Sequence, residues 1–234
     1  MKLKQKDFSQ TKTWICAAQK AQLLPLIAAS FADVDAQAYF DKYFVGDDAY
    51  ERKLRLYYAN SKVVGYCLLT FHQLNNQYIV KASAAFYPEY RQGGNTFNFS
   101  LSQVMKLKLK HPLSQVYYAD TMLSPAMYRA MAKNVAIVYP SEKMPANVES
   151  LYQQFNPQGR YSEVANCSCL LETGRKTNYS EAELTSLYHS EKPEISYYCK
   201  VNPAFSEGTA LFVIMPVTFS QLWLTALKLL KVTR

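Results

Sequence analysis

Residues 88–97, with the sequence PEYRQGGNTF, are the stretch of this chain whose residue types are best suited to bind a phosphate group. They follow an apolar run at residues 78–86 that is typical of a β-strand, and they precede a segment that is typical of a helix. Backbone N–H groups of such a loop and of the first helical turn converge on an anion, where the helix dipole favours negative charge. Gly93 and Gly94 let the backbone approach a phosphate without a Cβ, and Arg91 adds positive charge at the rim. The sequence therefore predicts a binding site for a phosphorylated cofactor.

Other patterns that carry chemistry are missing from the sequence. The three histidines belong to no Ser-His-Asp arrangement and to no metal-ligand spacing. The five cysteines form no Cys-x-x-Cys pair, and Cys167-Ser168-Cys169 has the wrong spacing for a zinc knuckle. Free thiols without a disulfide framework are typical of a reducing compartment, and the N-terminus lacks the apolar run of a signal peptide. We therefore expect a cytoplasmic protein without a bound metal.

The elements before the loop predict an antiparallel arrangement. Residues 13–17 read as a first strand, and an amphipathic helix follows, with apolar residues at helical spacing from Ala36 to Phe44. Three strand-like runs come next, at residues 54–59, 63–71 and 78–86, joined by short turns. Such short turns join antiparallel neighbours.

The elements after the loop alternate between helix and strand. Residues 96–110 fit a helix, although residues 105–110 alternate as in a strand, and we expect the helix because a helix best follows a phosphate-binding loop. A strand over 114–119, a helix from Ser124 to Lys133 and a strand over 135–139 come next. A strand, a helix and a further strand predict a parallel crossover. The fold class is therefore α/β, with a mixed and mainly antiparallel central sheet flanked by helices.

The remainder of the chain, residues 141–234, is less regular. It contains strand-like runs at residues 164–171, 195–201 and 210–215, and a short helix at 180–189. The last predicted element is a helix over residues 219–231 with a wide apolar face that we expect to pack against the protein.

Charge and composition narrow the classes of partner. The formal net charge is +8 and apolar residues make up 49% of the chain, as in a soluble globular protein that attracts anions such as nucleotides or CoA-like cofactors. No nucleic-acid recognition motif accompanies the charge, so we expect no nucleic-acid partner. Residues 209–230 carry one charged residue, Lys228, but Pro216 divides them, so we expect a packed strand and helix rather than an interfacial or membrane-spanning helix.

The element order and the loop together resemble the GNAT N-acyltransferase superfamily. In that family a strand ends in a small-apolar-apolar triplet followed by x-P-E-Y-R-x-x-G-x-G/A, and here residues 84–96 read AAFYPEYRQGGNT. Arg91 and Gly94 stand at the family's Arg and first Gly, whereas Thr96 stands where a second Gly or Ala is usual. The resemblance covers about residues 11–140.

The resemblance implies acetyl-CoA or another acyl-CoA as the acyl donor. In the family, backbone amides of this loop bind the CoA pyrophosphate, and main-chain groups at the preceding strand end bind the pantetheine arm. The implied cofactor-binding residues are therefore, in chain order, Phe86, Arg91, Gln92, Gly93, Gly94, Asn95 and Thr96.

The resemblance also implies candidate catalytic residues. Ser124-x-x-x-Tyr128 is similar to the family's Ala-x-x-x-Tyr, in which the Tyr protonates the leaving CoA thiolate; a phenol with a pKa of about 10 suits that role. The alternative for Tyr128 is a packing or hydrogen-bonding role. Asp120, at the end of the fifth strand, is the candidate general base, whereas Glu89 in the loop is typical of a solvated or helix-dipole residue.

Two functions follow as hypotheses. The first is an acyl-CoA-dependent N-acyltransferase that transfers an acetyl group to a primary amine, of a small molecule or a peptide, by direct attack in a ternary complex. The second is a degenerate module that binds CoA or a protein partner without turnover, which Thr96 and Thr121 favour because the family usually has Gly or Ala and Asn there. Residues 1–140 would form the acyl-CoA-binding core. Residues 141–234 would form an extension that completes the sheet and could shape the acceptor site or an oligomer interface.

Overall fold

The computed structural model of the chain describes residues 3–91 and 96–232, with the backbone alone at residues 231 and 232. The chain divides by packing into two compact units, Met1–Ser114 and Gln115–Arg234. Each unit contains antiparallel strands and flanking helices, so the predicted α/β fold with mainly antiparallel pairing is confirmed. We also predict that residues 1–140 form an acyl-CoA-binding core and residues 141–234 an extension. That division is functional rather than based on packing, and it stays a prediction.

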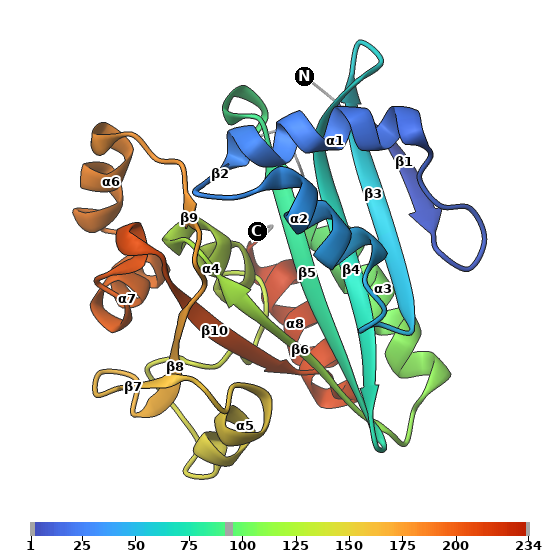
Figure 1. Cartoon of the computed structure of the whole chain (residues 1–234). Helices are drawn as coiled ribbons and strands as arrows, with labels where there is room; N and C mark the ends of the chain where they lie inside the picture. The colour runs from blue at the N-terminus through green and yellow to red at the C-terminus, as the bar shows by residue number, and fades with distance from the viewer. Residues whose placement is uncertain (1–2, 92–95, 233–234) are drawn as a thin grey trace. The chain divides into compact units, whose positions relative to one another are not determined.

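The first unit is built on four long antiparallel strands in the order β1, β3, β4 and β5. Figure 1 shows α1 and α2 in front of the strands β3 to β5, and α3 behind them. In chain order the elements are β1 (Lys4–Ser9), α1 (Ala17–Ser30), β2 (Phe31–Ala32), α2 (Ala36–Phe40), a π-helical turn (Asp41–Val45), β3 (Glu51–Ala59), β4 (Lys62–Leu74), β5 (Gln77–Phe86), a 3₁₀ turn (Pro88–Tyr90) and α3 (Thr96–Lys110).

The predicted three-strand meander is confirmed as β3, β4 and β5. The turn residues Asn60, Ser61 and Asn75 adopt positive φ, which tight hairpin turns require and which Asn tolerates better than most residues. Every residue of β4 from Val63 to Phe71 is buried. A strand buried on both faces needs cover on both sides, and α1 and α3 supply it.

The prediction of a first strand at residues 13–17 is wrong. The first strand is β1, an edge strand in which Asp7 accepts two hydrogen bonds from Arg55 at 2.6 and 2.7 Å. The sequence pattern did not indicate this strand, because the residues of β1 are mostly charged or polar. Charged side chains on an edge strand prevent it from pairing with strands of other chains. Residues 14–16 instead lead into α1, where the Cys16 N–H donates to the side chain of Gln19.

The second unit has strands in the order β6, β10, β8 and β7, all antiparallel. Its central strand β10 is the predicted run at 210–215 and is buried along almost its whole length. In chain order the elements are β6 (Gln115–Met122), α4 (Pro125–Ala132), α5 (Val148–Phe155), β7 (Arg160–Ser162), β8 (Cys167–Glu172), β9 (Lys176–Thr177), α6 (Glu181–Tyr188), α7 (Pro193–Val201), a 3₁₀ turn (Phe205–Glu207), β10 (Thr209–Pro216) and α8 (Phe219–Val232).

The strand predicted at residues 195–201 is a helix, α7. Alternating apolar residues from Ile195 to Val201 favoured a strand, but the buried positions are Ile195, Tyr198 and Val201, spaced as on one helix face. Pro193 stands in the first turn, where its missing N–H costs no hydrogen bond.

The strand predicted at residues 135–139 is also absent from the described part of the chain. Only Tyr139 pairs with a strand, through an isolated bridge to Ile214. The preceding backbone groups bond to side chains of α8: the Ala136 N–H donates to Thr225 at 3.2 Å, and the Ile137 carbonyl accepts from Gln221 at 2.7 Å. Side chains of α8 therefore satisfy backbone groups that the predicted strand would have paired with a neighbouring strand.

Helix α8 lies where the sequence predicts it, but the expected packing of its apolar face is wrong. Gln221 and Thr225 are each 3% exposed, whereas Trp223 is 67% exposed. Among residues 3–91 and 96–232, no helix has both the length and the apolar character needed to cross a bilayer.

Arg52 organises the connection between α2 and β3. Its side chain is fully buried; Nε donates to the Tyr43 carbonyl at 3.0 Å, and Nη2 forms an ion pair with Asp48 at 2.7 Å. Nη1 reaches the Ala49 carbonyl and the Gln10 side chain, each at 3.4 Å. A planar guanidinium can make bonds in these several directions at once, whereas an ammonium cannot.

Arg52→Lys is therefore predicted to lower the free energy of unfolding by about 2–4 kcal/mol, because buried acceptors lose their donors. Arg55→Lys, two residues along the same strand, is the matched control. Its ion pair with Asp7 is partly exposed, so we expect a change of about 1 kcal/mol or less. Denaturant unfolding of both variants measures the difference, and equal losses would contradict this role for Arg52.

Candidate functional site

The end of β5 is fixed by a close approach between Phe86 and Gly65. Gly65 lies opposite Phe86 in β4, and a Cβ at Gly65 would meet Cδ1 of the Phe86 ring at 2.0 Å. The ring of Tyr57 packs on Phe86 with centroids 4.9 Å apart. A glycine inside a strand often marks such an approach, so this position could have been found from the sequence run VVGYC.

The main chain at the end of β5 has defined partners. The Phe86 carbonyl accepts a hydrogen bond from Oγ of Ser30 at 3.3 Å, and the Tyr87 N–H donates to the Val64 carbonyl at 3.1 Å. A carbonyl oxygen can accept two hydrogen bonds, so the bond from Ser30 leaves Phe86 able to bind a ligand such as an amide N–H.

The loop after β5 begins as a turn, and the next described residue after Arg91 is Thr96, where α3 begins. The Tyr90 N–H donates to the Tyr87 carbonyl at 2.9 Å, and the Arg91 N–H donates to the Pro88 carbonyl at 3.3 Å. The predicted cofactor-binding residues Gln92, Gly93, Gly94 and Asn95 lie outside the described residues. Thr96 is the first residue of the 15-residue helix α3, so the predicted order of strand, loop and helix is present.

The loop carries one carboxylate, Glu89, and one guanidinium, Arg91. From Tyr90 to Ala119, which includes all of α3, the sequence contains no acidic residue. Arg91, at the start of the loop, is half-buried. The lysines of α3 stand in its last turns, where they complement the negative end of the helix dipole. Lys108 there is buried, and its Nζ donates to the carbonyls of Pro112 and Ser114, each at 2.9 Å. Arg91 is therefore the cation that the loop itself supplies.

The predicted catalytic residues lie in the second unit, so they are described apart from the loop. Asp120 is in β6, opposite Val213 of β10, and its Oδ1 accepts a hydrogen bond from the Thr121 N–H at 2.8 Å. The carboxylate is half-buried. A carboxylate held in this way by its neighbour has a fixed orientation near the end of the strand, as a general base requires.

Tyr128 lies in α4 and is 3% exposed. The helix begins at Pro125 after the predicted N-cap Ser124, whose Oγ accepts from the Met127 N–H at 3.4 Å. The Tyr128 hydroxyl donates to the Pro140 carbonyl at 2.8 Å. Burial, and then the nearby carboxylate of Glu194, raise the pKa of Tyr128, which therefore keeps its proton at neutral pH.

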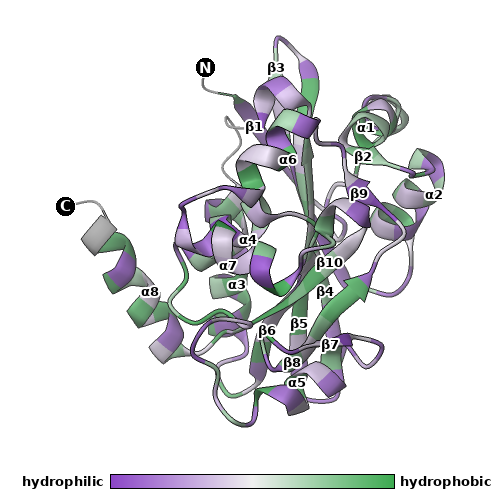
Figure 2. Ribbon diagram, turned by 90° about the vertical axis from the view of Figure 1, so that its left-hand side faces the viewer, coloured by the Kyte–Doolittle hydropathy of each residue, from purple (hydrophilic) through white to green (hydrophobic). Residues whose placement is uncertain are grey.

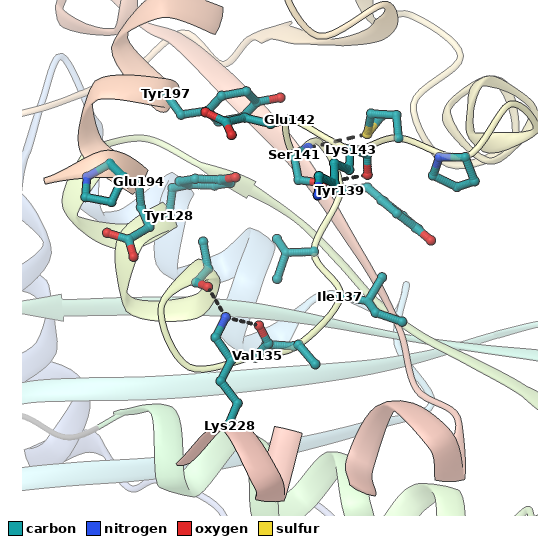
Figure 3. A pocket seen from close by; sticks show the side chains of 16 residues that line it. Tyr128, Val135, Ile137, Tyr139, Ser141, Glu142, Lys143, Glu194, Tyr197 and Lys228 are labelled. Carbon is teal, nitrogen blue, oxygen red and sulfur yellow. Dashed lines mark hydrogen bonds between the residues drawn. The ribbon is translucent and has the colours of Figure 1, made fainter. Parts of the chain in front are cut away.

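A pocket of about 680 Å³ opens beside Tyr128. Figure 3 shows Tyr128 and Tyr197 toward one end of it and Lys228 at the other. Its walls come from α4, the segment 135–145, the start of α7 and α8. The volume is within the range that holds a small organic ligand.

The pocket contains charges of both signs, and several have partners. Glu194 lies 3.5 Å from Nε of Arg129, whereas Glu142 is exposed. Lys228 donates from Nζ to the carbonyls of Ala132 and Val135, each at 2.8 Å, and burial lowers its pKa. The hydroxyl oxygen of Tyr197 is buried without a hydrogen-bond partner among the described residues. Sequence reasoning missed these residues because they come from segments distant in the chain.

His72 has a structural role rather than a chemical one. Nδ1 lies 2.8 Å from the Asp48 carbonyl and Nε2 lies 2.9 Å from Oγ1 of Thr70. Burial, followed by the charge of Lys81, lowers the pKa of His72. Within the described part of the chain, no group of three or more His, Cys, Asp or Glu side chains could hold a metal ion.

Comparisons with known proteins find solved structures that resemble the structure of this chain. No protein-family model and no curated protein matches the chain. The ribosomal-protein-S18-alanine N-acetyltransferase of Escherichia coli matches it with 8% identity and a TM-score of 0.39, over 92% of this chain and 96% of that one. A GNAT family acetyltransferase of Elizabethkingia anophelis with acetyl-CoA bound matches with 10% identity and a TM-score of 0.37, over 91% and 98%. Escherichia coli ElaA matches with 17% identity and a TM-score of 0.33, over 65% and 85%.

Gly65→Ala is predicted to destabilise the protein by about 1–3 kcal/mol, because the new Cβ forces the Phe86 ring from its place. In a Phe86→Ala background the same change should cost little or stabilise slightly, since alanine has a lower backbone entropy loss than glycine. Denaturant unfolding of the four proteins completes this cycle. An equal loss of unfolding free energy in both backgrounds would show that the Phe86 ring is not the reason why residue 65 must be glycine.

GNAT-family acetyltransferases thus recur among the solved structures with this likeness, and GNAT is the family that the PEYRQGGNT motif of this chain resembles.

Proposed function

We propose that the chain is an acyl-CoA-dependent N-acyltransferase. The observation that carries this proposal is the order of β5, the loop and α3: the strand ends at Phe86, the helix starts at Thr96, and PEYRQGGNT runs between them. A helix of this length presents free N–H groups and a positive dipole end at its first turn. Such an arrangement binds phosphate groups, including the pyrophosphate of a nucleotide cofactor.

The acyl-CoA would be held mainly by main-chain groups. The amides of residues 92–96 would bind the pyrophosphate, and Arg91 would add a charge at the rim. The Phe86 carbonyl would bind an amide of the pantetheine arm, in addition to its bond from Ser30. When bound, acetyl-CoA supplies the thioester that the acceptor attacks. The protein's share of the chemistry is then to orient the two reactants and to place the protons.

The transfer is a direct attack of a primary amine on the thioester carbonyl. The C–N bond forms, the C–S bond breaks, and CoA leaves as a thiolate. We propose that Asp120 accepts the proton of the amine, directly or through water, and that Tyr128 donates a proton to the thiolate. For Tyr128 this requires its hydroxyl to leave the Pro140 carbonyl and its raised pKa to fall in the complex with acyl-CoA, because a phenol with a raised pKa is a weaker acid toward the thiolate.

The pocket beside Tyr128 is the candidate acceptor site. Residues 141–145 and 193–197 belong to the predicted extension, and members of both segments line the pocket. The pocket is lined by two carboxylates, Glu142 and Glu194, and two ammonium groups, Lys143 and Lys228, and we propose that Glu142, which is exposed, is the group that contacts the amine of the acceptor.

A specific observation favours the second candidate, a module that binds CoA without turnover. The hydrogen bond from Tyr128 to Pro140 gives this side chain a structural role that needs no reaction. Thr121, where the family usually has Asn, fits the same interpretation.

Gly94→Trp and Arg91→Ala are predicted to weaken CoA binding. We expect micromolar binding of CoA and acetyl-CoA in isothermal titration, no measurable binding in Gly94→Trp, and a loss of about tenfold in Arg91→Ala. Arg160→Ala is the matched control, because it removes an exposed arginine in the second unit. Absence of binding in the wild type, or equal affinity in all four proteins, would overturn the assignment.

Tyr128→Phe is predicted to lower kcat about a hundredfold while leaving CoA affinity unchanged, because proton donation to the thiolate is lost. Release of free CoA thiol, measured against a panel of amines, gives kcat. Tyr161→Phe removes an exposed tyrosine hydroxyl of the second unit, outside the residues that line the pocket, and should leave kcat unchanged. A wild-type kcat in Tyr128→Phe would make Tyr128 a structural residue, and CoA binding without turnover of any amine would favour the second candidate.

A further inference from the structure

Helix α8 is amphipathic, but it turns its polar side toward the protein and its apolar side toward solvent. Its exposed side carries large apolar residues, here called the outer apolar face: Phe219 at 51% exposure, Trp223 at 67%, Leu224 at 42%, Leu227 at 38% and Leu230 at 63%. Figure 2 shows hydrophobic and hydrophilic residues alternating along this helix. Exposed apolar residues clustered on one helix are a marked feature, because single exposed leucines are ordinary but contiguous patches indicate an interaction site.

The inner side of α8 explains why the apolar residues point outward. Gln221, Thr225 and Lys228 recur at intervals of four and three, so they lie along one side of the helix. They make four hydrogen bonds to backbone groups of residues 132–137, at 2.7 to 3.2 Å. Turning the helix to bury Trp223 against this segment would break all four bonds and leave three half-buried carbonyls without these donors.

The chain as a whole is basic, with a formal net charge of +8, and after Glu207 its sequence has three basic residues and no acidic one. Lys228 lies on the inner side of α8, where it bonds to backbone carbonyls, so the attraction to anions comes from the net charge of the protein. An exposed face of Trp, Phe and Leu on a protein of net positive charge complements an anionic lipid surface. A two-fold contact between copies would instead bring two positively charged chains together.

The length of the helix limits the kind of membrane contact. Its 14 residues extend about 21 Å, which is shorter than the roughly 30 Å hydrocarbon core of a bilayer. The helix can lie in the plane of the interface with its apolar side among the acyl chains, while the inner side keeps its bonds to the protein.

We propose that the outer apolar face of α8 docks the protein on anionic lipid bilayers as an interfacial helix. This inference does not depend on the proposed acyl transfer. It assigns the helix a binding role that the packing of the second unit alone does not require.

Trp223 provides a direct probe of this docking. The chain has two tryptophans, so Trp14→Phe leaves Trp223 as the sole emitter. With vesicles of equal parts phosphatidylglycerol and phosphatidylcholine, we expect its emission to shift to shorter wavelength and the protein to sediment with the vesicles. Vesicles of phosphatidylcholine alone should bind less, and added salt should weaken binding to the anionic ones.

The double variant Trp223→Gln/Leu227→Gln tests the face itself. Glutamine retains good helix propensity, and both positions are exposed, so the fold should survive. We expect vesicle binding to fall on the order of a hundredfold, because two large apolar side chains no longer enter the interface. Leu113→Gln is the matched control, because Leu113 is 96% exposed outside α8, and it should bind as the wild type does.

Three results would overturn the proposal. The first is no emission shift and no sedimentation of the wild type with anionic vesicles. The second is equal vesicle binding by the double variant and the wild type. The third is a dimer in sedimentation equilibrium that the double variant abolishes, without vesicle binding, since a second copy would then cover the face.

Discussion

The close approach of the Phe86 ring to Gly65 is the contact on which the proposed site depends. It holds the last residue of β5 against β4, and it requires glycine at residue 65 because the ring occupies the space that any side chain there would need. The turn at Tyr87–Arg91 starts from this fixed point, and α3 starts a few residues later. A loop of this kind binds phosphate through main-chain N–H groups rather than through side chains. The positions of its two ends therefore largely determine where those N–H groups point and what they can bind.

The second unit shows what happens when backbone groups have no strand or helix to pair with. Residues 132–137 leave α4 without entering a sheet, and their carbonyl and N–H groups still need partners. Polar side chains of α8 supply them, at 2.7 to 3.2 Å. The helix therefore turns its polar side to the protein and its apolar side outward, which is the reverse of what hydrophobic burial alone would give. Hydrogen bonds to these half-buried backbone groups are made while Trp223 stays exposed.

The sequence was a good guide wherever local signals agreed with the fold. The meander of β3, β4 and β5 carried clear strand patterns and Asn-containing turns, and α3 and α4 had suitable boundaries at Thr96 and Ser124. The motif at residues 88–96 was found because its residue types are themselves the signal. Its place between a strand and a helix was also predicted, and the structure confirms it with β5 ending at Phe86 and α3 beginning at Thr96.

The errors have physical causes that a single sequence does not display. The residues of α7 alternate like a strand, but tertiary packing buries every third one, including Tyr198, which donates to the Met122 carbonyl at 2.7 Å. The hydroxyl of Tyr128 donates to the backbone carbonyl of Pro140, twelve residues away. Every residue has a backbone carbonyl, so no residue type in the sequence could indicate this partner. The pocket and the orientation of α8 likewise depend on contacts between segments far apart in the chain.

The central claim is that the loop between β5 and α3 binds the pyrophosphate of an acyl-CoA, and amide hydrogen exchange tests it most directly. With saturating CoA, peptides covering residues 87–99 should exchange more slowly than in the free protein, because their N–H groups donate to the phosphates. Peptides from α6, which the proposal does not involve, should be unchanged. Protection confined to other segments, or no protection anywhere at a CoA concentration shown to saturate binding, would contradict the account.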